Sequence, residues 1–177
     1  MNEIEVKVLN INKEEIQKKL VEIGAKLVKD EEQINIRFDT EDKYLRNIYH
    51  GYLRIRITKN NLSGEIINTL TLKRNIARDE FRVNEEMETQ ISNVEETVKI
   101  LEALKYRKKN PGKKHRISYL YDDILFEIDE WDKEIYSYPY LEIEVKQKDD
   151  LDRAIKLLNI DKKNITAKSI DELIKGK

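Results

Sequence analysis

The sequence contains no cysteine, which excludes a disulfide framework, a thiolate metal site and a cysteine nucleophile. Proline occurs twice and glycine five times in 177 residues, so the composition is not that of a flexible or low-complexity chain. No apolar run is long enough to span a bilayer, and no signal-like apolar segment occurs near the N-terminus. These absences predict a cytoplasmic protein with no membrane partner.

The sequence also has almost no net charge. Its 34 Lys and Arg residues and 35 Asp and Glu residues give a formal net charge of −1. Because no overall electrostatic field would attract nucleic acid, we expect no nucleic-acid partner. Any charge-driven binding must therefore be local. The length allows one sizeable core, and we expect a single domain over residues 1–177.

Apolar residues recur with two different periods along the chain. Alternation with period two predicts eight strands, at residues 3–8, 34–39, 52–58, 66–74, 80–91, 116–121, 124–131 and 140–146. Helical spacing predicts one helix capped by Asn12, with an apolar face that runs on to Leu27, and a second helix capped by Ser92. A third helix is expected at 149–158, a short one after Ser169, and a basic loop at 107–114.

Each predicted strand is apolar on one face and charged on the other. In a half-exposed sheet, the charged face would point to solvent. Amphipathic helices, however, need an apolar sheet face to cover, which would turn the charged faces inward. Eight strands are enough to close a barrel. The pattern therefore predicts an α+β protein, a closed eight-stranded antiparallel β-barrel with helices packed on the outside and a charged lumen.

The string Glu-Ile-Glu-Val-Lys occurs twice, at Glu3–Lys7 and at Glu142–Lys146. If both strings face one lumen, four carboxylates meet there, and such hard oxygen ligands suit Mg²⁺ or Mn²⁺. The second string also contributes Lys146, and the other charged faces contribute Arg82, Glu86, Glu88, Glu127 and Asp129. Guanidinium and ammonium groups that match a substrate with several phosphates are supplied by Arg54, Arg56, Lys73, Lys114 and Arg116.

An ordered series of motifs resembles the CYTH, or triphosphate tunnel metalloenzyme, superfamily. Its signature Glu-x-Glu-x-Lys corresponds to Glu3–Lys7, and later strands match Leu53-Arg54-Ile55-Arg56, Thr71-Leu72-Lys73-Arg74 and Pro139–Glu144. Two positions depart from the family pattern. Arg37 stands where an aromatic residue precedes Phe38, and Asn84 replaces the first basic residue of Arg-x-Glu-x-Glu, which leaves one phosphate contact on that strand open.

The resemblance implies roles for individual lumen residues. Glu3, Glu5, Glu142 and Glu144 are expected to bind the metal, and Asp129 is a further candidate ligand. Phosphate binding is expected from Lys7, Arg54, Arg56, Lys73 and Arg116, to which the strand pattern adds Lys114. Lys7, Glu5 or Glu144 would orient the attacking water.

Three functions fit such a lumen. The first is metal-dependent hydrolysis of inorganic triphosphate or of an organic or nucleoside triphosphate. The second is the class IV adenylate cyclase reaction, which converts ATP to cyclic AMP and pyrophosphate and needs a base pocket, for which Trp131 and nearby tyrosines are the only candidates. The third is noncatalytic binding of polyphosphate. A homodimer is left open.

Overall fold

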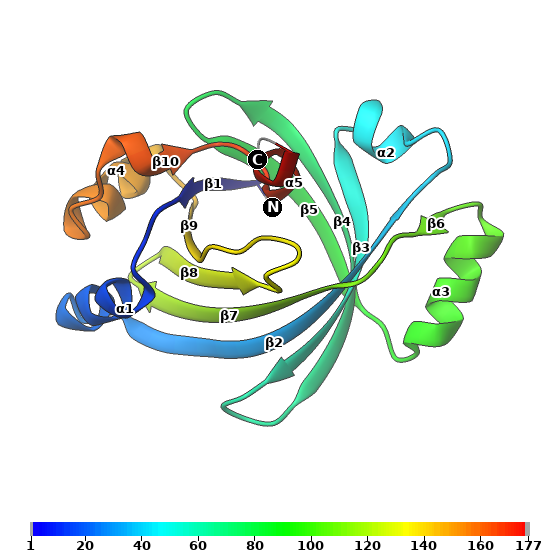
Figure 1. Cartoon of the computed structure of the whole chain (residues 1–177), viewed down its shortest axis with the longest axis horizontal. Coiled ribbons are helices and arrows are strands. Elements are labelled where there is room, and N and C mark those ends of the chain that lie inside the picture. Colours follow the sequence, from blue (N-terminus) through cyan, green and yellow to red (C-terminus); the bar gives the residue numbers. More distant parts are fainter. Residues whose placement is uncertain (1, 176–177) are drawn as a thin grey trace.

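The computed structural model describes residues 2–175, and these residues form a ten-stranded antiparallel sheet that closes on itself (Figure 1). Eight strands make the barrel in the order β1-β5-β4-β3-β2-β7-β8-β9, and β9 pairs back onto β1. Two short strands lie off this ring, with β6 paired to β2 and β10 to β1. The strands are β1 (Asn2–Val8), β2 (Lys26–Asp39), β3 (Gly51–Asn60), β4 (Ile66–Arg78), β5 (Arg82–Gln90), β6 (Arg107–Lys108), β7 (Gly112–Tyr121), β8 (Ile124–Trp131), β9 (Tyr140–Val145) and β10 (Ile165–Thr166).

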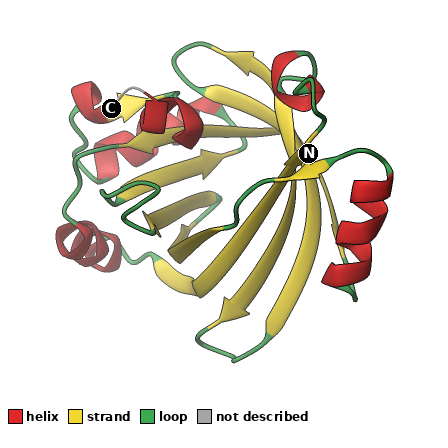
Figure 2. Cartoon of the chain, turned by 45° about the vertical axis from the view of Figure 1, so that its right-hand side comes forward, coloured by secondary structure: helices red, strands yellow, loops and turns green. Residues whose placement is uncertain are grey.

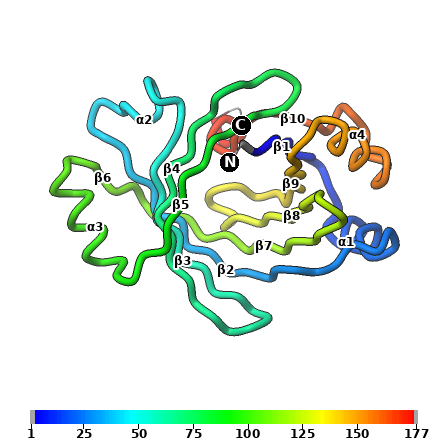
Figure 3. The backbone as a smooth tube through the Cα atoms, turned by 180° about the vertical axis from the view of Figure 1, so that it is seen from behind, coloured from blue at the N-terminus to red at the C-terminus, as the bar shows by residue number. Residues whose placement is uncertain are grey.

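Helices lie on the outside of this barrel (Figure 1). The helices of the described chain are α1 (Lys13–Glu22), α2 (Tyr44–Asn47), α3 (Val94–Ala103), α4 (Lys148–Leu157) and α5 (Ile170–Lys175). Figures 1 and 2 show α1 and α4 on one side of the barrel and α2 and α3 on the other. The tube in Figure 3 shows the same two groups from behind, with α5 close to β1. The fold class predicted from the sequence is confirmed.

The apolar faces of the strands point outward, under the helices. On the first side, Val6 is 1% exposed and packs in one cluster with Ile16 of α1 and Leu151 of α4. On the other side, Ile55 packs with Leu101 of α3. Because side chains alternate along a strand, the residues beside these must face inward. The predicted direction of the charged faces is therefore confirmed.

The first helix begins as expected but ends earlier. The Asn12 side chain accepts a hydrogen bond from the Glu15 amide at 3.0 Å, as a cap should. The helix ends at Glu22, and Gly24 adopts a left-handed φ of 84° that reverses the chain. Leu27 lies in β2 and is 45% exposed, so the prediction that it continues the helical face was wrong.

Other boundaries also differ from the sequence prediction, and the largest difference is that β2 begins at Lys26 rather than at residue 34. The cap of α3 is Asn93, which accepts from the Glu96 amide at 3.0 Å, because the β-ladder continues to Ile91, whose amide still bonds to Asn68. The expected basic loop at 107–114 contains β6 and the start of β7, both paired with β2.

In the part of the chain that the structure describes, no helix combines the length and apolar character required to cross a membrane.

Candidate functional site

The barrel lumen holds a cavity of about 980 Å³ that is lined by side chains from all eight barrel strands. It brings together most of the residues that the sequence selected, namely Glu3, Glu5, Lys7, Arg54, Arg56, Lys73, Glu86, Glu88, Lys114, Arg116, Glu127, Glu142 and Glu144. Asp129 does not line the cavity and is 0% exposed behind it. Lys146 was predicted as a lumen residue, and this was wrong. Because β9 ends at Val145, Lys146 leaves the strand alternation and is exposed, 3.8 Å from Asp123.

One side of the lumen is organised around a single arginine. We call the lumen-side residues Lys114, Arg116, Glu127, Asp129, Glu142 and Glu144 the β7–β9 wall. Arg116 donates from Nε and Nη2 to the two oxygens of Asp129, at 2.6 and 2.7 Å, and also pairs with Glu142 at 2.6 Å and with Glu127. Burial opposes its charge, but Asp129 and Glu127 hold the pKa of Arg116 above its usual value. This guanidinium group is therefore already saturated by carboxylates.

Asp129 holds two cations of this wall in place. Besides Arg116, it accepts a hydrogen bond from Lys114 Nζ at 2.8 Å. Burial, and next the nearby charge of Arg116, lower the pKa of Lys114 to about 7, although Asp129 acts in the opposite direction. In this structure, Asp129 orients the cations from behind rather than presenting free oxygens to the cavity.

Three carboxylates of the same wall remain close together inside the cavity. Ligand oxygens of Glu127, Glu142 and Glu144 all lie within 4.8 Å of one another. Burial, and then the charges of Glu127 and Glu142, raise the pKa of Glu144 well above its usual value. A divalent cation would relieve this repulsion, and three carboxylate oxygens suit Mg²⁺ or Mn²⁺. We call these residues the carboxylate trio.

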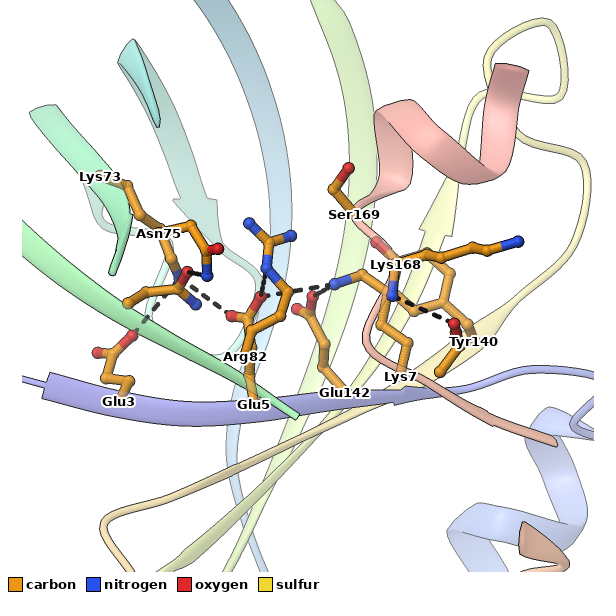
Figure 4. Close-up of polar contacts among 12 residues, drawn as sticks. Glu3, Glu5, Lys7, Lys73, Asn75, Arg82, Tyr140, Glu142, Lys168 and Ser169 are labelled. Carbon is orange, nitrogen blue, oxygen red and sulfur yellow. Dashed lines mark hydrogen bonds and ion pairs between the residues drawn. The ribbon is translucent and has the colours of Figure 1, made fainter. Parts of the chain in front are cut away.

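The two Glu-x-Glu strings do face one cavity, because β1 and β9 are antiparallel neighbours in which Glu5 pairs with Glu144 and Lys7 with Glu142. Their carboxylates are engaged differently, however. Glu3 and Glu5 accept hydrogen bonds from Lys73, at 3.5 and 3.1 Å, while Lys7 forms an ion pair with Glu142 at 2.5 Å (Figure 4). Burial opposes the charge on Glu5, but Lys73 and Lys7 lower its pKa below the usual value.

The opposite side of the lumen has cations with few partners. We call Arg54, Arg56, Thr71, Arg82, Glu86 and Glu88 the β3–β5 wall. Within the described residues, Arg54 Nη2 makes only long contacts, at 3.4 Å to Thr71 and 3.5 Å to Glu86, and its buried Nε has no hydrogen-bond partner. Arg56 Nε donates to Asn35 at 3.0 Å. Among the described residues, no carboxylate forms an ion pair with Arg56. Burial, followed by the charges of Arg54 and Arg116, lowers the pKa of Arg56 to about 10.

One mouth of the cavity is bordered by α5, a feature that the sequence did not predict. Asp171 and Glu172 of α5 pair with Arg37 and Arg78, each at 2.6 Å. Beside these ion pairs, Ile170 packs with Tyr140 in a small apolar cluster. The capping box expected at the start of this helix is confirmed, since the Ser169 amide donates to Glu172 at 2.8 Å.

Trp131 lines the cavity, but much of its ring is already in contact with protein. A Cβ on Gly112 would lie 3.0 Å from the ring, Lys114 Nζ lies 5.4 Å from its centroid, and its indole N–H donates to the Tyr140 hydroxyl at 2.9 Å. The two histidines, for which the sequence predicts no role, lie at different places in the fold. His50 lines the cavity, whereas His115 bonds to Asp30 at 2.8 Å.

Solved structures resemble this chain over nearly their whole length. The PH1012 protein of Pyrococcus horikoshii is 25% identical, with a TM-score of 0.77, and the match covers 97% of this chain and 98% of that one. A candidate adenylate cyclase of Vibrio parahaemolyticus is 16% identical, with a TM-score of 0.77 and coverage of 99% and 98%. HpAC1 of Hippeastrum, described as an adenylyl cyclase candidate with a dominant triphosphatase activity, is 18% identical, with a TM-score of 0.70 and coverage of 99% and 95%.

No curated protein matches the sequence. The family model for the CYTH domain, in contrast, matches residues 1–170, which is most of the chain and includes both Glu-x-Glu strings. With the closed barrel and its charged lumen already established, this match identifies the chain as a member of the CYTH domain family.

Proposed function

We propose that this protein hydrolyses a triphosphate inside the tunnel with the help of a divalent metal ion. The observation that carries the proposal is that the carboxylate trio and the partner-poor arginines of the β3–β5 wall share one cavity. Phosphoryl transfer needs positioning and neutralisation of charge more than covalent chemistry, and these two groups supply both.

The carboxylate trio fits a hard divalent cation, so Glu127, Glu142 and Glu144 would hold Mg²⁺ or Mn²⁺. Such an ion supplies neutralisation of the phosphate oxygens. Glu127 was not among the expected ligands, whereas Glu142 and Glu144 were. The roles of Glu3, Glu5 and Asp129 as metal ligands stay predictions. Lys73 forms ion pairs with Glu3 and Glu5. Asp129 forms ion pairs with Lys114 and Arg116.

The chain's own residues would bind and orient the substrate. Arg54 and Arg56 have N–H groups free for phosphate oxygens, while Lys73 and Lys7 add point charges from neighbouring strands. Arg116 would have to exchange a carboxylate for phosphate, so we assign it mainly to positioning the trio. Lys7, which lies between Glu5 and Glu142, and the carboxylates of Glu5 and Glu144 are the groups that would orient the attacking water.

Cyclisation of ATP is the second candidate, because two structural neighbours are described as candidate adenylate cyclases. That reaction needs a surface for the base. Trp131 is the main aromatic candidate, and its contacts with Gly112, Lys114 and Tyr140 leave it committed to packing. Noncatalytic binding of polyphosphate is disfavoured, because a site that only binds anions gains nothing from three carboxylates at its centre.

The deciding experiment incubates the protein with inorganic triphosphate, thiamine triphosphate and ATP, each with Mg²⁺ or Mn²⁺, and assays phosphate release and cyclic nucleotide. We expect metal-dependent phosphate release and no cyclic AMP. Cyclic AMP with pyrophosphate would establish the cyclase, and binding without turnover would establish the binding module. A cytoplasmic location, a homodimer and the absence of a nucleic-acid partner stay predictions.

A further inference from the structure

Arg82 is a lumen cation on β5 to which neither the strand pattern nor the family resemblance gives a role. It lines the cavity, and its side chain is 16% exposed. Its one ion pair within residues 2–175 is a long contact of 3.7 Å between Nε and Glu5 Oε1, and the buried Nε has no hydrogen-bond partner. Its two terminal nitrogens have none among the described residues. Figure 4 shows its guanidinium group directed away from β1, between Asn75 and Lys7.

The surroundings of Arg82 are rich in positive charge. Arg82 pairs with Glu5 across the β1–β5 ladder, and Glu5 is also contacted by Lys73 at 3.1 Å and by Lys7 at 3.8 Å. Three cations therefore surround one carboxylate, and Lys73 and Lys7 already neutralise it. A guanidinium group with free N–H donors that faces a cavity is suited to bind phosphate oxygens in a bidentate manner.

Position 84 explains why a cation would be needed here. Asn84, which replaces the basic residue of the family pattern, is 0% exposed, and its side-chain oxygen accepts from Asn75 at 3.1 Å. Arg82 lies two residues before Asn84 and therefore on the same face of β5. Close to it, the β4–β5 pairing has a register shift between Asn75 and Ala77. The same side of the lumen thus carries a cation two residues before the expected place.

We propose that Arg82 binds a phosphate group of the substrate, together with Lys7, and supplies from position 82 the positive charge that Asn84 lacks. The inference rests on the proposed function, since the ligand is the same triphosphate. The competing role is structural. If Arg82 only balances the charge of Glu5, its removal will change stability and leave phosphate binding as it was.

The test measures binding of tripolyphosphate to the full chain by calorimetry, alongside phosphate release in the presence of Mg²⁺. Because a charge-assisted contact is lost, Arg82→Ala should weaken binding roughly 10- to 100-fold. Arg82→Lys should lie between that variant and the original protein, since ammonium keeps the charge without the bidentate fork. Arg153→Ala is the matched control, because it removes one positive charge from the outer surface, where Arg153 pairs with Asp122.

The double variant Arg82→Ala with Asn84→Arg returns the cation to the family position and should recover much of the lost affinity. Should Arg82→Ala not fold, Arg82→Gln keeps much of the side-chain length and tests the same contact. Unchanged tripolyphosphate affinity in Arg82→Ala or Arg82→Gln would overturn the inference. If the unsubstituted protein binds tripolyphosphate but releases no phosphate, the proposed hydrolysis fails, and the affinities still decide the role of Arg82. If it binds none, both proposals fail.

Discussion

The β7–β9 wall and the β3–β5 wall face each other across one cavity, and both contain arginines and glutamates. The two walls differ in how the positive charges of their arginines are neutralised. Arg116 is held by three carboxylates, whereas Arg54 makes only long contacts and Arg56 has an amide oxygen as its partner. The effect on pKa is opposite. Carboxylates raise the pKa of Arg116, while burial and neighbouring cations lower the pKa of Arg56 to about 10.

This difference indicates a division of labour. A cation saturated by carboxylates is part of a rigid scaffold, here one that keeps Glu127 and Glu142 beside Glu144. A buried cation with few partners costs free energy until an anion arrives. The β7–β9 wall should therefore control folding and metal binding, and the β3–β5 wall should control affinity for phosphate.

The largest effect should come from removing the centre of the scaffold. Arg116→Ala removes the arginine that the carboxylates of Glu127, Asp129 and Glu142 share, and should lower the free energy of unfolding by about 3–5 kcal/mol, as expected for a broken buried ion pair. Urea denaturation measures this. Arg153→Ala, in an exposed ion pair, is the control and should cost about 1 kcal/mol or less. Equal losses in the two variants would contradict the scaffold role.

Glu144→Gln separates metal binding from stability. The amide keeps the size but removes one ligand charge, so turnover should fall roughly a hundredfold or more. Without metal, melting should occur at the same or a higher temperature, because repulsion with Glu127 and Glu142 is relieved. Calorimetry with and without Mg²⁺ shows whether the metal-induced stabilisation is lost, with the exposed Glu65→Gln as control. Full stabilisation by Mg²⁺ in Glu144→Gln would remove Glu144 from the metal site.

Arg56→Ala tests the opposite wall. It removes a phosphate donor that has no carboxylate partner, so it should reduce kcat/KM for tripolyphosphate by roughly 10- to 100-fold. Melting should change little or improve, since an uncompensated buried charge disappears. A large loss of stability with unchanged kinetics would mean that the two walls do not differ as described.

The smallest effect is expected outside both walls, at the mouth. Although burial acts in the other direction, hydrogen bonds from Arg78 and Ser169 lower the pKa of Glu172 to about 2. Because this is below the unfolded value, Glu172 stabilises the protein above about pH 4.5 and loses that contribution as the pH falls toward 2. Glu172→Gln should cost about 1 kcal/mol or less at neutral pH, because the pair is exposed to solvent. Thermal melts at pH 7 and pH 3, with exposed Glu102→Gln as control, should show this cost at pH 7 and a smaller one at pH 3. An equal cost at both pH values would contradict the assignment.

Much of the fold could be predicted because one residue pattern repeats on every strand. Alternation of apolar and charged residues defined the lumen face, and β8 begins and ends where it was expected, at Ile124 and Trp131. The prediction failed where alternation outlasts the strand, as at Lys146, or where the helical apolar spacing outlasts the helix, as at Leu27, whereas the position of Gly24 near the helix end was expected and is confirmed. The four-residue helix α2 has too short a pattern to recognise.

The pairing of charges inside the lumen could not be predicted in the same way. Parity placed Glu127 and Asp129 on the same face, but only the three-dimensional arrangement shows that Asp129 holds Lys114 and Arg116 while Glu127 joins Glu142 and Glu144. Similarly, strand parity alone places both Arg82 and Arg116 on the lumen face. Their difference depends on which carboxylates of neighbouring strands come within reach.

The central claim is that opposed walls of carboxylates and partner-poor arginines form a site for triphosphate. Steady-state kinetics of phosphate release from tripolyphosphate and from pyrophosphate, with Mg²⁺, test it most directly. A ligand with three phosphates can engage both the β3–β5 wall and the carboxylate trio through a metal, whereas pyrophosphate leaves buried cations unpaired. We expect kcat/KM to favour tripolyphosphate by roughly a hundredfold or more, which corresponds to about two lost charge-assisted contacts. Comparable kcat/KM for the two substrates would contradict the account.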